Sequence, residues 1–411
     1  MIRNISIQGF KSIANVQNLE LGQINVFVGA NGCGKSNLLE AIGVLGAAAS
    51  GHVDSESLSR RGVRLSPAEL YKTLLRQRDE TGNSISFRVS GEWGQHPLEY
   101  AVSLKVPTAN SDSWKYVIDE LSSQGDLVFN QDSIGDPITQ WSNEPPRTHS
   151  LGGKVAYLSR IVEHKRVGTS PKNMMAYIQE YAIFSPTTPV LRGLQSDAVK
   201  LFPLGLTGGG LAEAIDELLN IHKHTIGELD LEEVLDLLDW VDEFSIGRPS
   251  RDLLSADVPS LRSIVEFKDR WMGEKRNRLS GYDASEGSLY VLFMLVLALH
   301  PKSPKFFAVD NFDQALNPRL ARALSRLFCR IIIDSSRQAL LTTHNPLVLD
   351  GLDLRDDRIR LFAVERNQQT NGATKISRVQ LSEKVLIQAE NGTPLSQMWV
   401  MGLLGGVPDI F

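Results

Sequence analysis

Eight consecutive residues near the start of the chain place glycines, a lysine and a serine at a fixed spacing. They read Gly29-Ala30-Asn31-Gly32-Cys33-Gly34-Lys35-Ser36 and match G-x-x-x-x-G-K-[ST] in full. In this pattern backbone N–H groups enclose phosphate oxygens, the lysine neutralises the β and γ phosphates, and the serine hydroxyl binds Mg²⁺. The pattern predicts a nucleoside triphosphate site with these contacting residues: Asn31, Gly32, Cys33, Gly34, Lys35, Ser36 and Asn37.

A second candidate group lies far along the chain. Phe306–Val309 is an apolar run of strand-forming residues that ends at Asp310. A lone Asp after a strand is more often a cap or a turn former. Together with the phosphate loop, however, it has the form of the carboxylate that orients Mg²⁺ and its waters. We therefore predict Ser36 and Asp310 as the magnesium-binding residues.

Each of these residues needs an element to position it. Ile24–Val28 is rich in strand formers, and apolar residues recur at helical spacing after the loop, which gives the strand–loop–helix context that the pattern requires. After about residue 280 the chain reads as an apolar helix, the strand Phe306–Val309, a helix over about 318–332 and a strand over 339–342. This order predicts an α/β sheet with both faces covered.

The middle of the chain has a different pattern. Short alternating runs predict an antiparallel sheet, at Ile85–Val89, Leu98–Val106, Leu127–Asn130 and Val155–Leu158. Further on, an apolar stripe among acidic residues predicts an amphipathic helix with these buried positions: Leu231, Val234, Leu235, Leu238 and Val241. We expect the stripe to pack on its own domain, with a partner-protein surface as the alternative.

We therefore predict an α/β domain whose two halves are separated by a long insertion. Residues 1–50 form the first half, 51–270 the insertion and 271–411 the second half. Within the insertion we expect a β lobe at about 81–160 and a mainly helical part at about 170–245.

Three further stretches, taken with the phosphate loop, resemble the motifs of ABC-type ATPases. Asp283–Gly287 resembles the signature loop, Asp310–Pro318 resembles Walker B with the D-loop, and Thr342–Pro346 resembles the switch-histidine segment. The opening Ile7–Ile13 and the terminal Gly402–Pro408 also resemble the branch that contains SMC, RecF and OLD-type proteins, with an AAA_21-type head. The glutamine of the family's Q-loop is not placed, with Gln77 as a candidate.

The resemblance implies an ABC-type P-loop ATPase head with ATP and Mg²⁺ as cofactors. Two heads would meet face to face, as a dimer or within a higher oligomer, with two ATP molecules between them. Ser285, Glu286 and Gly287 of one copy would then approach the γ-phosphate bound by Lys35 of the other. His344 would hydrogen-bond the γ-phosphate.

One residue departs from the family's pattern. The family normally has Glu directly after the Walker B aspartate, whereas this chain has Asn311. An amide can position a water molecule but cannot accept its proton. Asp313 is the nearest substitute carboxylate. We expect strong ATP binding with slow or conditional hydrolysis, so that the chain's status as an enzyme stays open.

No sustained heptad repeat appears between residues 50 and 270, and the chain ends about 65 residues after His344, too short for the Toprim nuclease of the OLD group. An ATPase head with neither a coiled-coil arm nor a Toprim domain resembles the ATPase subunits of anti-phage systems such as Septu and PARIS. We expect a scaffold or sensor that controls a separately encoded nuclease or toxin. One alternative is a RecF-like DNA-binding repair ATPase, with basic runs at Arg270–Arg278 and Arg60–Arg64. Another is a nucleotide-locked scaffold.

Composition limits the other possibilities. Lys and Arg number 43 against 48 for Asp and Glu, so the net charge of −5 gives no overall positive field, and any DNA contact must be local. Only two cysteines occur, far apart, which fits a reducing compartment and excludes a thiolate zinc site. The longest apolar run, Leu289–Leu299, is too short to span a membrane, and the N-terminus lacks a signal-peptide pattern. We expect a cytoplasmic protein without a membrane partner.

Overall fold

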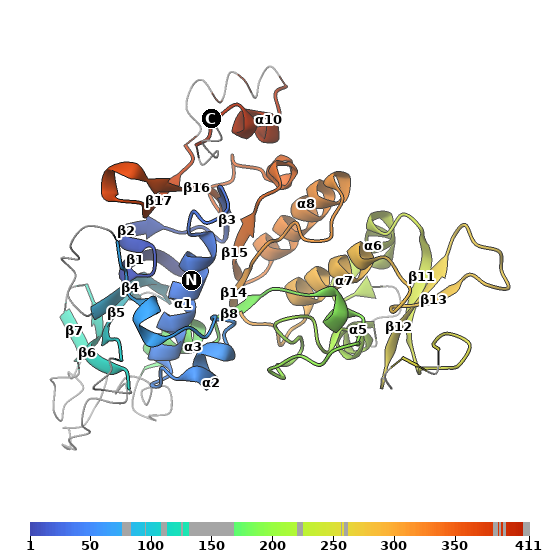
Figure 1. Ribbon diagram of the computed structural model, residues 1–411, viewed down its shortest axis with the longest axis horizontal. Helices are drawn as coiled ribbons and strands as arrows, with labels where there is room; N and C mark the ends of the chain where they lie inside the picture. Colours follow the sequence, from blue (N-terminus) through green and yellow to red (C-terminus); the bar gives the residue numbers. More distant parts are fainter. Residues whose placement is uncertain are drawn as a thin grey trace.

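The computed structural model describes residues 1–75, 84–94, 96–107, 113–124, 126–130, 168–219, 225–255, 257–258, 262–380, 385, 388 and 392–405 (Figure 1). The predicted strand Val155–Leu158 and the candidate Gln77 lie outside these residues. Strands and helices form layers in the order antiparallel sheet, helices, mostly parallel sheet, helices. The predicted α/β fold is thereby confirmed.

The mostly parallel sheet is the central layer. Its six strands are, in spatial order, β17 (Ala373–Arg378), β16 (Ile359–Asn367), β3 (Ile24–Val28), β15 (Gln338–Thr343), β14 (Phe306–Val309) and β8 (Ala182–Phe184). All pairings are parallel except that of β16 with β17. Every residue of β3, β14 and β15 is buried, because helices cover both faces of the sheet.

Helices cover the two faces in pairs. One face carries α1 (Lys35–Ala49) and α3 (Thr169–Gln179), and the other carries α7 (Glu286–Leu299) and α8 (Pro318–Asp334). Successive side chains of a strand point to opposite faces. Val26 therefore packs in the core with α7 and α8, whereas Phe27 packs in the core with α1 and α3.

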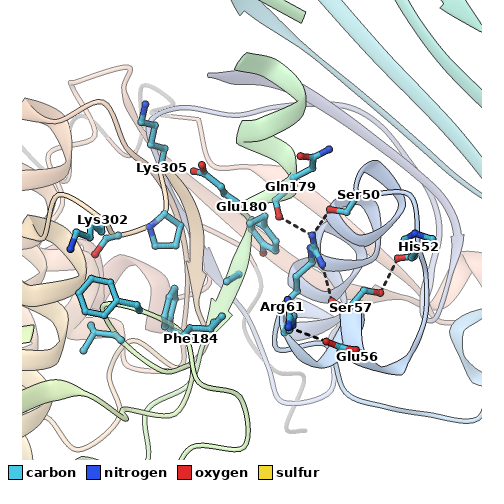
Figure 2. Close-up of a pocket in the computed structure, with 18 of the residues that line it drawn as sticks. Ser50, His52, Glu56, Ser57, Arg61, Gln179, Glu180, Phe184, Lys302 and Lys305 are labelled. Carbon is cyan, nitrogen blue, oxygen red and sulfur yellow. Dashed lines mark hydrogen bonds and ion pairs between the residues drawn. The ribbon is translucent and has the colours of Figure 1, made fainter. Parts of the chain in front are cut away.

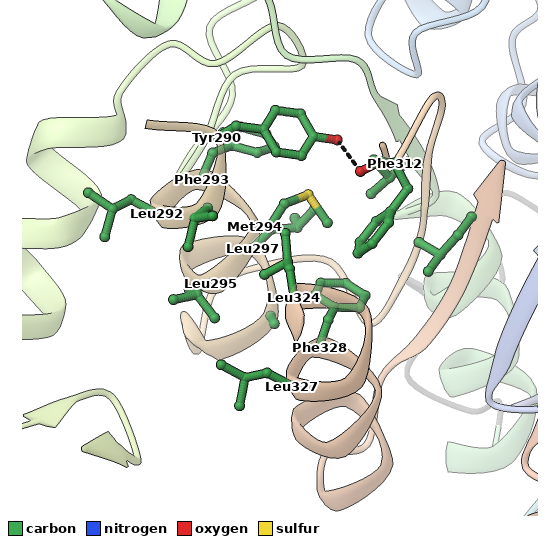
Figure 3. Packing of buried hydrophobic residues seen from close by; sticks show 14 of the residues in the cluster. Tyr290, Leu292, Phe293, Met294, Leu295, Leu297, Phe312, Leu324, Leu327 and Phe328 are labelled. Carbon is green, nitrogen blue, oxygen red and sulfur yellow. Dashed lines mark hydrogen bonds between the residues drawn. The ribbon is translucent and has the colours of Figure 1, made fainter. Parts of the chain in front are cut away.

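Helix α7 is apolar on all sides and lies in the centre of one core. Figure 3 shows its side chains packed against those of α8, including Leu297 beside Leu324. The hydroxyl of Tyr290 donates to the carbonyl oxygen of Phe312 at 3.1 Å, which ties the helix to the segment after β14. In the described ranges no helix is long and apolar enough to cross a membrane, and α7 has 14 residues against the roughly 20 that a span needs.

The antiparallel sheet joins the start of the chain to part of the predicted insertion. Its strands are, in order, β2 (Ile13–Glu20), β1 (Ile2–Phe10), β4 (Ser84–Trp93), β5 (His96–Lys105), β6 (Lys115–Ser123) and β7 (Asp126–Asn130). Strand β1 pairs with β4 from Ile2 opposite Gly91 to Gln8 opposite Ser86. Because β8 also joins the central sheet, the predicted boundaries at residues 50 and 270 do not follow the sheets.

The segment 211–280 forms a small α/β region beside α7. It contains α5 (Leu211–Leu219), β9 (Thr225–Ile226), β10 (Leu229–Asp230), α6 (Leu231–Leu237), β11 (Val241–Gly247), β12 (Ile264–Asp269) and β13 (Arg278–Ser280). The predicted acidic helix is shorter than expected, because it ends at Leu237 and Val241 begins a strand paired with β12. Val234, Leu238 and Val241 are nevertheless buried in the domain's own core.

Short elements complete the fold. They are α2 (Ser55–Ser59), α4 (Thr188–Leu191), α10 (Leu395–Val400) and the 3₁₀ helices η1 (Ala68–Tyr71), η3 (Pro346–Gly351) and η4 (Gln368–Thr370). The predicted mainly helical part at about 170–245 is thus a mixture of helices α3 to α6 and short strands.

Candidate nucleotide site

The candidate residues come together at one edge of the central sheet. The glycine-rich loop follows β3, Asp310 follows β14 and His344 follows β15, and Ser185, which the sequence did not predict, follows β8. These four strands are parallel, so their carboxyl ends share that edge. Ligands of open α/β sheets bind at the carboxyl ends of the strands.

The glycines of the loop differ in what surrounds them and in their backbone conformation. A Cβ atom on Gly29 would collide with the carbonyl oxygen of Val364, and one on Gly34 would collide with the hydroxyl of Thr374. Gly34 is also the N-cap of α1, with a φ of 113° that side chains rarely adopt. Gly32 has a φ of 74°, and the space beside it is open. Strands β16 and β17 therefore crowd the loop at Gly29 and Gly34, whereas the space beside Gly32 is open.

Lys35 is the cation of the site. Its side chain is 5% exposed, and Nζ donates to the carbonyl oxygens of Gly29 at 2.7 Å and Ala30 at 3.0 Å. Burial lowers the pKa of Lys35, and neighbouring groups, among them Asp310, offset part of that effect. A cation with little water around it attracts an anion more strongly than one in bulk water, so Lys35 provides the loop with a cation that can attract an anion.

Ser36 and Asp310 lie side by side. The Ser36 hydroxyl donates to Oδ2 of Asp310 at 2.9 Å, and the Thr342 hydroxyl donates to Oδ1 at 2.5 Å. No group of three or more His, Cys, Asp or Glu that could hold a metal exists among the described residues. Mg²⁺ is usually bound by one or two carboxylates together with substrate phosphates and water, so this pair fits a magnesium ion that arrives with a nucleotide.

Asp313 and His344 belong to the same cluster. Oδ1 of Asp313 accepts the Thr343 hydroxyl at 2.7 Å and the backbone N–H of His344 at 3.2 Å. The imidazole Nδ1 of His344 lies 3.4 Å from Nζ of Lys35. Burial, with a further contribution from the Lys35 charge, lowers the pKa of His344, so the ring is neutral at pH 7. Asp313 thus holds the segment that carries the histidine.

Asn311 has an unusual backbone. Its φ is 58°, a left-handed conformation that Asn tolerates better than most residues. Its N–H donates to the Thr342 hydroxyl at 2.9 Å, and its carbonyl oxygen accepts the Tyr290 hydroxyl at 3.3 Å. Within the described residues its side-chain amide makes no hydrogen bond, so the amide is free for a ligand or water.

The predicted signature residues are held separately. Ser285 is the N-cap of α7 and makes no capping hydrogen bond through its side chain. Behind it, Glu286 bonds to Thr188, and Arg192 donates to the Ala284 carbonyl oxygen at 3.1 Å. Gly287 passes close to the D-loop, because a Cβ there would lie 3.0 Å from the Ala315 carbonyl oxygen. Among the described residues no hydrogen bond joins 285–287 to 31–37.

Asn37 has hydrogen-bond partners within the chain. Its side-chain amide donates to the Ser12 hydroxyl at 2.7 Å, which itself lies 2.7 Å from the hydroxyl of Thr374. Thr374 also donates to the carbonyl oxygen of Cys33 at 2.8 Å. Asn37 therefore fastens the loop to the β1–β2 turn and to β17. The sequence carries no signal for Thr374, which is far from Cys33 along the chain.

Other residues at the site were also missed. A cavity of about 430 Å³ beside Ser36 and Asp310 is lined by Glu40, Arg64, Ser185 and Asp197, among others. Glu40 is buried and forms ion pairs with Lys11 and Arg64. Ser185 takes the position after β8, next to Asp310, whose N–H donates to the Phe184 carbonyl oxygen.

A larger cavity, about 720 Å³, lies at the opposite edge of the sheet (Figure 2). It is lined by Gln179–Ala182 and Phe184, just before and within β8, and by Pro301–Lys305, which precede β14. The guanidinium of Arg61 donates to the Ser57 carbonyl oxygen, the Ser50 hydroxyl and the Gln179 carbonyl oxygen at 2.9, 2.6 and 2.9 Å. Burial lowers the pKa of Arg61 to about 10. Arg61 thus ties helix ends together, and none of the predicted site residues lies here.

Two family models match separate parts of the chain. The model described as "AAA ATPase domain" matches residues 1–113. The model described as "AAA domain, putative AbiEii toxin, Type IV TA system" matches residues 222–350. The two matches include the phosphate loop and the segment from Ser285 to His344.

Curated relatives and solved structures are similar over different spans. The chromosome partition protein Smc of Delftia acidovorans is 29% identical over 186 residues, which are 44% of this chain and 14% of that protein. Smc of Desulfitobacterium hafniense is 57% identical over 42 residues, 10% of this chain and 4% of that protein. An Smc head bound to the C-winged helix domain of ScpA has a TM-score of 0.52 at 11% identity, covering 94% of this chain and 99% of that one. That likeness shows the fold.

Proposed function

We propose that this chain, an SMC/RecF-like ABC-type ATPase head, binds ATP and Mg²⁺ at the glycine-rich loop and closes with a second copy over two nucleotides. We further propose that hydrolysis is slow and that the closed state controls a separately encoded effector in anti-phage defence. The observation that carries the proposal is the meeting of Lys35, Ser36, Asp310 and His344 at one sheet edge. Ser36 and Asp310 would hold Mg²⁺, while Asn31–Ser36 would hold the phosphates.

The free hydroxyl of Ser285 supports closure with a second copy. The residues around it are bonded within their own chain, whereas within the described part of the chain the Ser285 side chain and the N–H groups of Glu286 and Gly287 have no hydrogen-bond partner. Such a helix start attracts an anion. Phosphate bound by Lys35 of a second copy would provide it, and a two-fold pair satisfies both sites at once.

ATP with Mg²⁺ is expected to convert the wild-type monomer into a dimer, and Ser285→Arg to weaken that dimer by at least about 10-fold. The arginine side chain would occupy the space that the other copy's γ-phosphate needs. Light scattering after gel filtration measures the mass. Equilibrium dialysis at a protein concentration too low for dimerisation measures the ATP affinity of the single copy, which should stay within about two-fold. Ser250→Arg, at an exposed loop serine, is the control. Unchanged wild-type mass with bound ATP, or full dimerisation of Ser285→Arg, would contradict the closed pair.

The hairpin β12–β13 supports an effector-binding role. Trp271 at its tip is 78% exposed and Met272 is 42% exposed. Oδ1 of Asp269 accepts the N–H groups of Trp271 at 2.7 Å and Met272 at 3.0 Å, so the tip is ordered. Exposed Trp and neighbouring Arg are the residue types that dominate protein interfaces. The Smc head bound to an ScpA domain is a related head with a protein partner, and the AbiEii description of the matching family model is consistent with a defence role.

A protein encoded by a neighbouring gene is expected to co-purify with the chain when both are expressed, and Trp271→Ala should reduce its recovery at least about 10-fold. The tryptophan would be buried in the interface, and its loss removes that contact. Phe202→Ala, at another ring that is 52% exposed, is the matched control. If nothing co-purifies, or if Trp271→Ala recovers the protein as well as wild type, the proposed docking surface is wrong.

The two basic runs give less support to a DNA-binding role. Arg61 is buried among helix ends, Arg64 pairs with Glu40, and Arg60 lies 3.0 Å from Glu56. In the second run, Arg278 pairs with Glu266. Few of these cations are free for phosphates, and DNA binding needs several of them along one track.

A further inference from the structure

Strand β16 carries one arginine past the end of its neighbour to the phosphate loop. The pairing of β16 with β3 ends at Ala363 opposite Val28, and the loop begins with the next residue of the β3 side. Val364 then contacts Gly29, and Arg366 follows two residues later, opposite Thr374 of β17. The register of the sheet therefore places Arg366 beside the loop.

The guanidinium of Arg366 is fixed at two points. Nε donates to the carbonyl oxygen of Gly32 at 3.0 Å, and Nη1 donates to the carbonyl oxygen of Gly372 at 2.7 Å. The residue is exposed, and its neighbour Glu365 pairs with Lys375 instead. In the described part of the chain no carboxylate pairs with Arg366. A planar cation is thus held at the rim of the site without a counter-ion.

The space next to this cation is open. Gly29 and Gly34 are crowded by Val364 and Thr374, whereas no atom lies within 4 Å of a Cβ built on Gly32. Gly32 is the residue whose carbonyl oxygen Arg366 binds. A ligand in the loop can therefore extend past Gly32 along the guanidinium.

The hydrogen bonds of Arg366 fix the orientation in which its guanidinium can meet a ligand. Arginine binds phosphate through a fork of two N–H groups. Arg366 uses two of its five N–H groups, one on Nε and one on Nη1, for Gly32 and Gly372, and these two bonds fix the plane of the guanidinium. Both donors lie in the guanidinium plane, so its two faces stay free, and such a face stacks on heteroaromatic rings.

We propose that Arg366 is the residue on which the base of the bound nucleotide stacks. This inference rests on the proposed binding of ATP by the loop. It adds that the β16–β17 hairpin, which no motif marks, forms the base-binding wall of the site. Stacking on a flat cation suits a purine better than a pyrimidine, because a purine offers the larger ring surface.

The test compares ATP, CTP and inorganic tripolyphosphate, which has the phosphates without a base. Calorimetry is expected to show that Arg366→Met weakens ATP about 5- to 30-fold and CTP less, while tripolyphosphate affinity stays within about two-fold. Arg366→Lys should lose ATP affinity like the methionine variant, because an ammonium group has no planar face. Lys375→Met, which removes one charge from the same hairpin, should leave all three ligands unchanged.

Equal weakening of ATP and tripolyphosphate by Arg366→Met would overturn the proposal, because the arginine would then serve the phosphates or the loop. Unchanged ATP affinity would overturn it as well. Wild-type protein that binds neither ligand would instead refute the proposed nucleotide site. Melting temperatures of the variants without ligand show whether each is folded, and Arg366→Lys serves as the second variant if the methionine protein is unstable.

Discussion

Replacing Lys35 with alanine is expected to weaken ATP binding by at least about 100-fold, or about 2.8 kcal/mol. The reason is the burial of its ammonium group, which already lies against the loop carbonyls of Gly29 and Ala30 before a nucleotide arrives. The ammonium group is therefore already held at the loop, and a charge shielded from water interacts strongly. Calorimetry with ATP and Mg²⁺ measures the change.

The same substitution should cost the nucleotide-free protein little stability. Burial penalises the Lys35 cation, and its hydrogen bonds are to carbonyl oxygens, which are neutral. We therefore expect the free energy of unfolding without nucleotide, measured by thermal unfolding, to change by less than about 1 kcal/mol. Lys375→Ala, at an exposed lysine of the adjacent hairpin, is the control and should bind ATP normally. Wild-type affinity in Lys35→Ala would show that the loop does not bind the phosphates.

The central sheet could be predicted where its strands are buried on both faces. Ile24–Val28 and Phe306–Val309 are continuous apolar runs between polar segments, and each forms the strand expected from it. Strand β8 was missed because it has only three residues. The partnership of β1 with β4 was also missed, since pairing between segments so far apart depends on the packed core and leaves no local pattern.

Helical spacing misled at one place. The apolar residues from Leu231 to Val241 fit a helix, but Leu238 has left the helical conformation and Val241 pairs with Asp269 of β12. The spacing indicates which residues are buried. The same residues are buried in a continuous helix and in a short helix followed by a strand, so the pattern alone could not place the end of the helix.

At the candidate site, too, local sequence patterns were informative and contacts between distant segments were not. Residues that are neighbours in the sequence, from Gly29 to Ser36, could be assigned from their spacing, and their roles stay predictions. Arg366 and Thr374 reach the loop only through the register of β16 and β17. No spacing rule connects positions that meet across a sheet.

Asn311→Glu is expected to raise the rate of ATP cleavage about 10²- to 10⁴-fold, the range typical of a positioned general base. A carboxylate can accept the proton of the attacking water, which the amide of Asn311 cannot. Among the described residues the side chain of Asn311 makes no hydrogen bond, so the substitution breaks none. Single-turnover cleavage of ATP by the preformed complex measures the chemical step.

The backbone of Asn311 requires a matched control. At its φ of 58° most side chains cost about 1 kcal/mol, so Asn311→Glu should lower stability slightly. Asn311→Gln has the same length and the same backbone cost without the carboxylate, and it should cleave ATP as slowly as wild type. Equal rates in the two variants would show that the carboxylate is not what the site lacks.

Asp313→Ala tests whether Asp313 contributes to the slow ATP cleavage expected of the wild type. Oδ1 of Asp313 is already occupied by the hydroxyl of Thr343 and the N–H of His344, so we expect it to position the histidine. Its loss should lower the slow wild-type rate further, because His344 would lose its anchor beside Lys35. Rapid wild-type turnover that Asp313→Ala leaves unchanged would contradict both the slow hydrolysis and the positioning role.

If Asn311→Glu cleaves ATP rapidly, its ATP-bound dimer should also dissociate sooner than that of wild type, since cleavage removes the γ-phosphate that Ser285 of the second copy would contact. A long-lived dimer in a fast variant would mean that cleavage does not open the pair.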